Sequence, residues 1–152
     1  MITLQDEMYA GILLSIEQYL DRKEIDFFVG GSRRFGYSGN KSDLDIFIDA
    51  SDHSKMELLL EEFRWSGIVL GSNSAHDLYP DTVFSWYGKV HFILMSYRHS
   101  FSLLKDEHDD LEHYLKINSD IKTAVSSQII SSGVSGAVVY RVLLALMRMH
   151  IP

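Results

Sequence analysis

The N-terminal part of the chain combines a helical spacing of hydrophobic residues with a short apolar run. Apolar residues at every third or fourth position from Leu4 to Ile16 predict a helix that Thr3 can cap. After a charged break, residues 25–29 read as a short buried strand that leads directly into Gly30-Gly31-Ser32. We therefore expect a helix, a strand and a glycine-rich turn in that order.

The clearest strand signal covers residues 44–49, where apolar and other residues alternate. Because successive side chains of a strand point to opposite faces, this alternation assigns each residue to a face. The two predicted sets are Leu44, Ile46 and Ile48 on one face, and Asp43, Asp45 and Phe47 on the other.

The rest of the chain shows both the helical spacing and the strand-like alternation of apolar residues. The pattern predicts a helix over about residues 54–63, a strand over 68–70, a loop over 73–81, and a hairpin of strands over 82–86 and 90–96. From residue 100 onward it predicts two short helices and a last helix over about 135–149. The predicted fold class is α+β, a mixed β-sheet flanked by helices. Residues 1–97 would form the core, and residues 98–152 a helical extension packed on it as a single compact unit.

Composition and charge narrow the class of protein. The chain has 152 residues, 46% hydrophobic and 23% charged, which is typical of one globular domain. It has no cysteine, which excludes disulfides and thiolate metal sites. The net charge of −7 disfavours binding to extended nucleic acid, because such binding needs a surplus of Lys and Arg. Without a basic leader or a long apolar run, we expect a cytoplasmic protein that does not associate with membranes, in an oligomeric state that the sequence leaves open.

Gly30, Gly31 and Ser32 have the composition of a phosphate-binding turn. Glycines at the end of a strand let the backbone turn sharply and bring its amide groups against an anion. The Ser32 hydroxyl adds a hydrogen-bond donor, and Arg33 and Arg34 add positive charge close by. A Gly-Gly-Ser sequence alone is usually only a turn, so its meaning depends on the residues that come after it.

Ten residues after Ser32, Asp43 and Asp45 begin the alternating strand. At the usual rise of a strand their Cα atoms lie about 6.5–7 Å apart. Two carboxylates this close repel each other unless a cation or a proton lies between them. Hard oxygen ligands of this kind suit Mg²⁺, which takes one or two carboxylates together with waters and substrate phosphates.

Taken in order, these features resemble the DNA polymerase β-type nucleotidyltransferase superfamily, in particular its minimal members. Their signature reads Gly-Ser-Arg-x-Tyr-Gly followed by Ser-Asp-x-Asp, with ten residues between the serine of the turn and the first aspartate. The residues that match it are Gly31, Ser32, Arg33, Gly36, Ser42, Asp43 and Asp45. Phe35 stands in for the aromatic residue, and Arg34 replaces a usual alanine.

The resemblance implies a nucleotidyltransferase-like fold and a metal-dependent reaction. A hydroxyl of a protein or small molecule would attack the α-phosphorus of a nucleoside triphosphate, expected to be ATP, and pyrophosphate would leave. The implied nucleotide-binding residues are Gly30, Gly31, Ser32, Arg33 and Ser42. Asp43 and Asp45 would be catalytic and would hold Mg²⁺ or Mn²⁺. Minimal members often adenylylate a helical partner ribonuclease, which makes a protein acceptor or partner an expectation here.

The sequence departs from the superfamily at the third catalytic carboxylate. His91 stands on the later strand where an acid is expected, and no Asp or Glu occurs from Thr82 to Lys105. Three hypotheses are open. His91 could be catalytic and act as the base; the acid could come from Asp77, Asp81 or a partner chain; or the site could be a catalytically inactive binding module for nucleotide or protein.

The segment from Lys105 to His113 is rich in charged residues and histidines. On a helix, His108 and Glu112 would share a face, which is one spacing of metal ligands. Because no third convergent ligand is evident, we expect a solvated acidic helix face instead.

Overall fold

A five-stranded mixed sheet forms the centre of the protein in the computed structural model, which describes residues 4–36, 43–71, 82–131 and 136–150. The strands are β1 (Phe27–Gly30), β2 (Leu44–Asp49), β3 (Val69–Leu70), β4 (Thr82–Trp86) and β5 (Val90–Met95). They lie in the order β1-β2-β5-β4-β3. Only the central pair, β2 with β5, is parallel; the other pairs are antiparallel.

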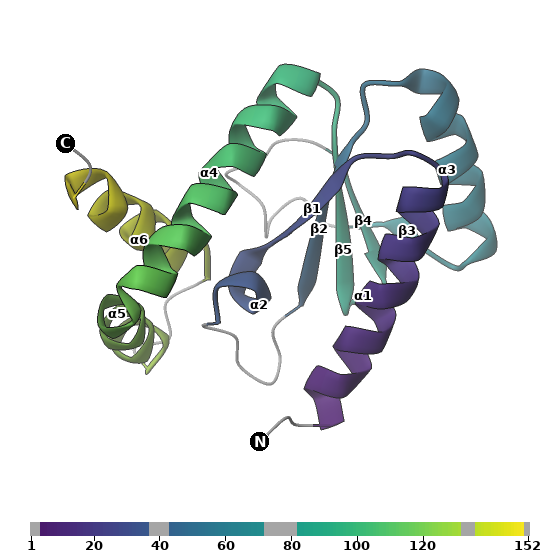
Figure 1. Cartoon of the computed structure of the whole chain (residues 1–152). Coiled ribbons are helices and arrows are strands. Elements are labelled where there is room, and N and C mark those ends of the chain that lie inside the picture. The colour runs from purple at the N-terminus through teal and green to yellow at the C-terminus, as the bar shows by residue number, and fades with distance from the viewer. Residues whose placement is uncertain (1–3, 37–42, 72–81, 132–135, 151–152) are drawn as a thin grey trace.

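Helices cover both faces of this sheet, which confirms the predicted class of a mixed sheet flanked by helices. The helices are α1 (Leu4–Arg22), α2 (Gly31–Phe35), α3 (His53–Trp65), α4 (Arg98–Ile117), α5 (Ser119–Ser131) and α6 (Gly136–His150). Helices α1 and α3 lie on one side of the sheet, and α2 and α4 lie on the other (Figure 1). Helices α5 and α6 lie beyond α4, away from the sheet.

The alternation predicted for β2 is confirmed by the two cores that its faces join. Leu44, Ile46 and Ile48 are buried in one cluster with residues of α1 and α3. Phe47 is buried in a different cluster, with Phe28 of β1 and residues of α4 and β5. Asp45 therefore lies on the α4 side of the sheet, as its position in the alternation requires.

A third hydrophobic cluster joins α2 to the C-terminal helices. Phe35 packs there with buried residues of α4 and α6, among them Leu111, Tyr140 and Leu143. Helix α4 begins at Arg98, the first residue of the predicted extension, and its Phe101 is buried in the cluster that includes Phe47. The division into a core and an extension at residue 97 stays a prediction.

Three elements differ from the sequence prediction. Residues 31–35 form a short helix where only a turn was expected, and α4 is one long helix of 20 residues instead of a short one. The long helix forms because Phe101, His108 and Leu111 continue a single buried stripe across the charged segment. Strand β1 begins at Phe27 instead of residue 25, since the Ile25 amide donates to the Leu20 carbonyl and closes the end of α1. The predicted loop at 73–81 lies outside the described residues.

No helix in the described part of the chain has the length and apolar character needed to cross a bilayer.

Candidate functional site

The turn between β1 and α2 lies against the carboxylate of Asp45. Gly31 has a positive φ of 73°, which L-residues with a side chain rarely adopt. A Cβ atom at Gly31 would lie only 2.3 Å from Oδ2 of Asp45. Gly30 is the register partner of Asp45 across the antiparallel pair β1–β2. The glycine at position 31 therefore provides both the backbone conformation and the space for the acid.

Asp43, Asp45 and His91 meet at one end of the central parallel strand pair. Asp45 and His91 are register partners on β2 and β5, and Asp43 immediately precedes β2. Nδ1 of His91 lies 3.5 Å from Oδ1 of Asp45 and 3.7 Å from Oδ2 of Asp43. The side chains of His91 and Asp45 are 16% and 18% exposed, and that of Asp43 is 37% exposed. The structure thus brings together the three residues that the sequence singled out as catalytic candidates.

The charge of this cluster changes the titration of the histidine. Interaction with the Asp45 carboxylate raises the pKa of His91, partial burial of the ring opposes that rise, and the negative charge of Asp43 adds to it. The protonated imidazole is therefore stabilised between the two acids. It supplies a positive charge at the position where a divalent cation is expected.

The donor atoms of the cluster partly fit a magnesium ion. Among the described residues, no group of three or more His, Asp or Glu side chains is arranged to hold a metal ion. Asp43 and Asp45 do supply two neighbouring carboxylates, which is the protein contribution usual for Mg²⁺ bound together with substrate phosphates. The site fits a cation that arrives with a phosphate-bearing substrate better than a cation held by protein ligands alone. Ser42, Asp77 and Asp81 lie outside the described residues.

Arg33 is held beside the turn by an aromatic ring of α1. Its guanidinium carbon lies 3.7 Å from the centre of the Tyr9 ring, a close cation–π contact. Tyr9 itself is buried, with 5% of its surface exposed. Ser32, the next residue toward the turn, is half-buried at the start of α2. Arg33 and Ser32 therefore lie together at the N-terminal end of α2, next to Gly31.

Arg34 does not share this position, because it connects α2 to α4. Its Nη1 donates to the Val29 carbonyl at 2.9 Å, and its Nη2 donates to Oδ1 of Asp109 at 2.6 Å. Glu112 also lies 3.4 Å from Nη2. The carboxylates of α4 thus offset the charge that was expected to serve the turn, and Arg34 has a structural contact with the helical extension.

The predicted solvated acidic face is present, since Asp106, Asp109 and Asp110 are exposed, but His108 does not belong to it, because its side chain is buried with only 1% of its surface exposed. Its Nδ1 donates to the Leu104 carbonyl at 2.8 Å, and its ring stacks on Tyr140 of α6. Burial lowers the pKa of His108 to about 4, so the ring is neutral at physiological pH.

Two further residues hold α6 against α4 at this point. The Tyr140 hydroxyl donates to Oε1 of Glu107 at 2.6 Å, and Arg148 donates to Oε2 of the same carboxylate at 2.9 Å. The sequence pattern alone did not single out this set of residues. The signal that could have found it is the helical spacing of Phe101, His108 and Leu111, which places the histidine on the apolar stripe.

Gly30 links the buried histidine to the turn. A Cβ atom at Gly30 would lie 2.5 Å from the Phe47 ring and 2.9 Å from Nε2 of His108. Any residue other than glycine would displace one of these two rings. The two glycines therefore serve different neighbours: Gly31 makes room for Asp45, and Gly30 makes room for the aromatic core beneath the site.

The chain matches no model of a known protein family, and it matches no curated protein and no solved structure. The function of this site must therefore be inferred from its own residues.

Proposed function

We propose that this protein is a metal-dependent nucleotidyltransferase with a nucleotidyltransferase-like fold. It would transfer a nucleoside monophosphate from a nucleoside triphosphate, ATP in the first instance, to a hydroxyl of a protein or small molecule. The observation that supports the proposal is the close approach of the Gly31 turn to Asp45, which is one of two carboxylates two residues apart. The spacing of Ser32, Asp43 and Asp45, which resembles the superfamily signature, adds to it.

Each residue of the site has a physical task in this proposal. The amides of the Gly30–Gly31 turn and the Ser32 hydroxyl bind phosphate oxygens. Arg33, which lies on the Tyr9 ring, offsets the negative charge of these oxygens. Asp43 and Asp45 would hold Mg²⁺ or Mn²⁺, which when bound neutralises phosphate charge and polarises the reacting group.

The proposed transfer is a single displacement. The acceptor oxygen forms a bond to the α-phosphorus, the bond from this phosphorus to the pyrophosphate oxygen breaks, and the hydroxyl proton must leave. His91 in its neutral form is the group beside the two acids that can take this proton. Its half-buried position on β5 orients the imidazole toward the carboxylates and limits its contact with bulk water.

A second candidate function is nucleotide binding without transfer. His91 favours it, because this residue is the register partner of Asp45 at the position where the superfamily usually has a third carboxylate. A protonated histidine there would neutralise the acids and weaken their hold on a cation. Such a module would keep the phosphate turn but would not release pyrophosphate.

Transfer of label from α-phosphate-labelled nucleoside triphosphates tests the proposal directly. Each of the four nucleotides is incubated with the protein, Mg²⁺ or Mn²⁺, and a cell extract as the source of acceptors. We expect label on an acceptor with the native protein and none with Asp43→Asn/Asp45→Asn. Absence of label under every condition, with the native protein folded by circular dichroism, would contradict the transferase proposal.

Thermal unfolding of the same samples distinguishes nucleotide binding without transfer from nucleotide transfer and from the absence of nucleotide binding. A binding module is expected to gain several degrees of thermal stability from a nucleoside triphosphate with a divalent cation, although no product forms. The absence of both label and stabilisation would contradict the two candidates together.

A further inference from the structure

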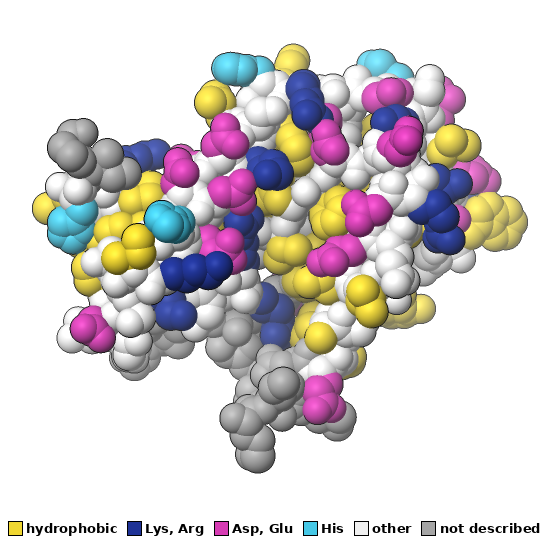
Figure 2. Space-filling view, in the orientation of Figure 1, with side chains coloured by type: hydrophobic (Ala, Val, Ile, Leu, Met, Phe, Trp, Pro, Cys, Tyr) yellow, Lys and Arg dark blue, Asp and Glu magenta, His cyan; other side chains and the backbone are white. Residues whose placement is uncertain are grey.

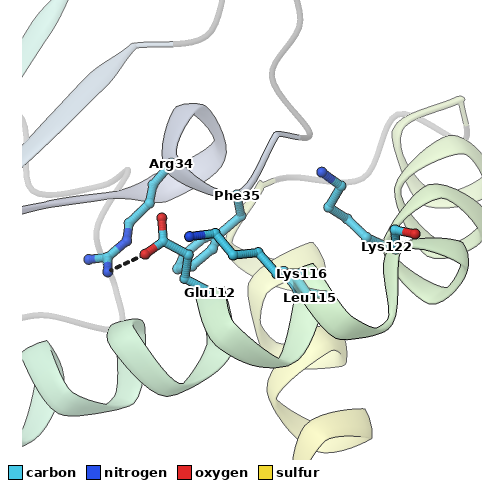
Figure 3. Close-up of a pocket in the computed structure, with 7 residues that line it drawn as sticks. Arg34, Phe35, Glu112, Leu115, Lys116 and Lys122 are labelled. Atoms are coloured by element: carbon cyan, nitrogen blue, oxygen red, sulfur yellow. Dashed lines mark hydrogen bonds and ion pairs between the residues drawn. The ribbon is translucent and has the colours of Figure 1, made fainter.

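A pocket of about 200 Å³ opens where α2 meets the junction of α4 and α5, away from the Asp45–His91 pair. Its wall consists of Arg34, Phe35, Glu112, Leu115, Lys116 and Lys122, together with Ser119. Lys116 comes from α4 and extends toward Glu112, whereas Lys122 comes from α5 and extends toward the end of α2 (Figure 3). Helix α2 and the junction of the consecutive helices α4 and α5, which are distant from α2 in the sequence, thus build one cavity.

The charge of this pocket is opposite to that of the whole protein. Three cationic side chains and one carboxylate line it, whereas the chain carries a net charge of −7. Figure 2 shows Lys and Arg side chains on the face that includes the helical extension, with acidic side chains among them. Positive charge concentrated in a concave site raises the local concentration of anions.

The charges in the pocket are not equally compensated. Arg34 is paired with Asp109 and Glu112. The side-chain ammonium groups of Lys116 and Lys122, by contrast, form no hydrogen bond or ion pair with any residue that the structure describes. The one lining carboxylate, Glu112, is thus shared with Arg34, and the pocket keeps an excess of positive charge.

Gly36 keeps one of these ammonium groups close to α2. A Cβ atom at Gly36, whose φ is 78°, would lie 3.0 Å from Nζ of Lys122. The absence of a side chain at position 36 allows the lysine to approach the backbone at the end of α2. Ser119, the first residue of the 13-residue helix α5, also lines the pocket, so the positive end of this helix lies at the cavity.

We propose that this pocket is a binding site for a phosphate-bearing ligand, either a phosphomonoester or a polyphosphate. A phosphomonoester carries a charge of about −1.5 to −2 at neutral pH. This charge matches the excess of cationic side chains in the lining, where Arg34, Lys116 and Lys122 face a single carboxylate, Glu112, better than the single charge of a carboxylate ligand does. Lysine binds phosphate as a point charge and needs no bidentate geometry. The apolar side chains of Phe35 and Leu115 provide a surface for the carbon atoms next to the phosphate.

The inference goes beyond the proposed function, because binding here requires neither Asp43 nor Asp45 and no transfer of a nucleotide. The phosphate could belong to the nucleoside triphosphate or to a separate phosphorylated acceptor. Both sources share the chemistry that the pocket recognises, and an experiment can distinguish them by the site each ligand occupies.

Titrations followed by amide NMR test the proposal, with inorganic phosphate, glucose 6-phosphate and ATP as three separate probes at constant ionic strength. The amides of Ser119 and Lys122 report the pocket, and the amides of Gly31 and Ser32 report the turn. We expect saturable shifts of the first pair with at least one probe. Lys116→Gln/Lys122→Gln should weaken that binding about tenfold or more, since each lysine contributes a direct charge interaction.

Two matched variants complete the experiment. Lys23→Gln/Arg64→Gln removes the same charge from exposed positions elsewhere and should bind like the native protein. Asp43→Asn/Asp45→Asn should also retain binding in the pocket, which separates this inference from the proposed function.

The three probes also identify the source of the phosphate. If only ATP shifts both amide pairs, in a single 1:1 step, the ligand is the nucleotide. If phosphate and the sugar phosphate bind the pocket alone, the ligand is a phosphorylated acceptor.

The proposal is overturned by either of two results. The first is the absence of saturable shifts at Ser119 and Lys122 with all three probes. The second is equal affinity in the native protein and in Lys116→Gln/Lys122→Gln, provided that the variant retains the native amide spectrum outside the pocket.

Discussion

Asp45 and His91 are direct neighbours across the only parallel strand pair of the described sheet, with 3.5 Å between Oδ1 and Nδ1. The same aspartate lies against Gly31 on its other side. One carboxylate therefore connects the phosphate-type turn to the imidazole. A proton on His91 and a divalent cation would compete for this carboxylate, so the charge state of the histidine and the binding of a cation are expected to oppose each other.

The first prediction concerns the titration of His91. Its pKa should lie above the ordinary value of a histidine because of Asp45 and, to a smaller extent, Asp43. Asp45→Asn should lower this pKa more than Asp43→Asn does. The measurement is an NMR titration of the His91 Cε1–H resonance in the three proteins. An unchanged pKa of His91 in Asp45→Asn would contradict the interaction between these two side chains.

The second prediction compares two glycines with positive φ. Gly88→Ala places its Cβ in open space, so only backbone strain of about 1–2 kcal/mol should reduce the free energy of unfolding. Gly31→Ala adds a clash with Asp45 and should cost at least about 1 kcal/mol more. Urea unfolding of both variants measures the difference. Equal losses would show that Asp45 does not pack against the turn.

The third prediction concerns stability against pH. His108 has a pKa of about 4 in the folded protein and about 6.5 when unfolded, so the unfolded chain binds the extra proton between these values. Its contribution to stability is complete above pH 6.5 and is lost as the pH falls toward 4, by about 3 kcal/mol in total. The raised pKa of His91 acts with the opposite sign, since its contribution is complete below pH 6.5 and is lost as the pH rises through its folded value.

Urea unfolding between pH 4 and pH 7 measures this effect. The free energy of unfolding of the native protein should fall more steeply with acidification than that of His108→Gln, whatever the absolute cost of the substitution. The exposed His113 provides a control, because His113→Gln should follow the native curve. Parallel curves for His108→Gln and the native protein would mean that the buried ring does not determine this part of the acid sensitivity.

The fourth prediction concerns the connection between α2 and α4. A double-mutant cycle of Arg34→Gln and Asp109→Asn should give a coupling of about 0.5–1.5 kcal/mol, because the Arg34 side chain is only 11% exposed. The matched cycle of Lys105 with Asp109, an exposed pair on one helix, should give only about 0.3–0.5 kcal/mol. If the two couplings are the same, the Arg34 contact adds nothing beyond an ordinary surface pair.

The elements of the sheet could be predicted because their signal is local. The alternation of Leu44, Ile46 and Ile48 needs only neighbouring residues, and the structure places all three on one face as predicted. The hairpin was recognisable from Gly88, and β4 has the predicted bounds. The spacing of Ser32, Asp43 and Asp45 likewise singled out residues that the fold brings to the same end of the sheet.

The contacts of Arg34 and His108 could not be predicted, because they depend on pairs distant in the sequence. Arg34 meets Asp109 from 75 positions away, and no local pattern indicates which helix receives it. His108 lies in a run of charged residues, which outweighed the apolar spacing of Phe101 and Leu111. The short helix α2 was missed for a similar reason. Gly30 and Gly31 suggest a turn, and only the packing of Phe35 explains why the following residues form a helix.

The parallel pairing of β2 with β5 also determines the order in which the site can assemble during synthesis. Strands β1 and β2 are antiparallel neighbours in the sequence, so Gly31 and Asp45 can meet early, through a short loop closure. Leu44 pairs with Val90, so β5 must leave the ribosome before His91 can join them. A nascent chain that ends before β5 would carry its two carboxylates without the imidazole, and it would acquire the complete cluster only when the central strand closes the sheet.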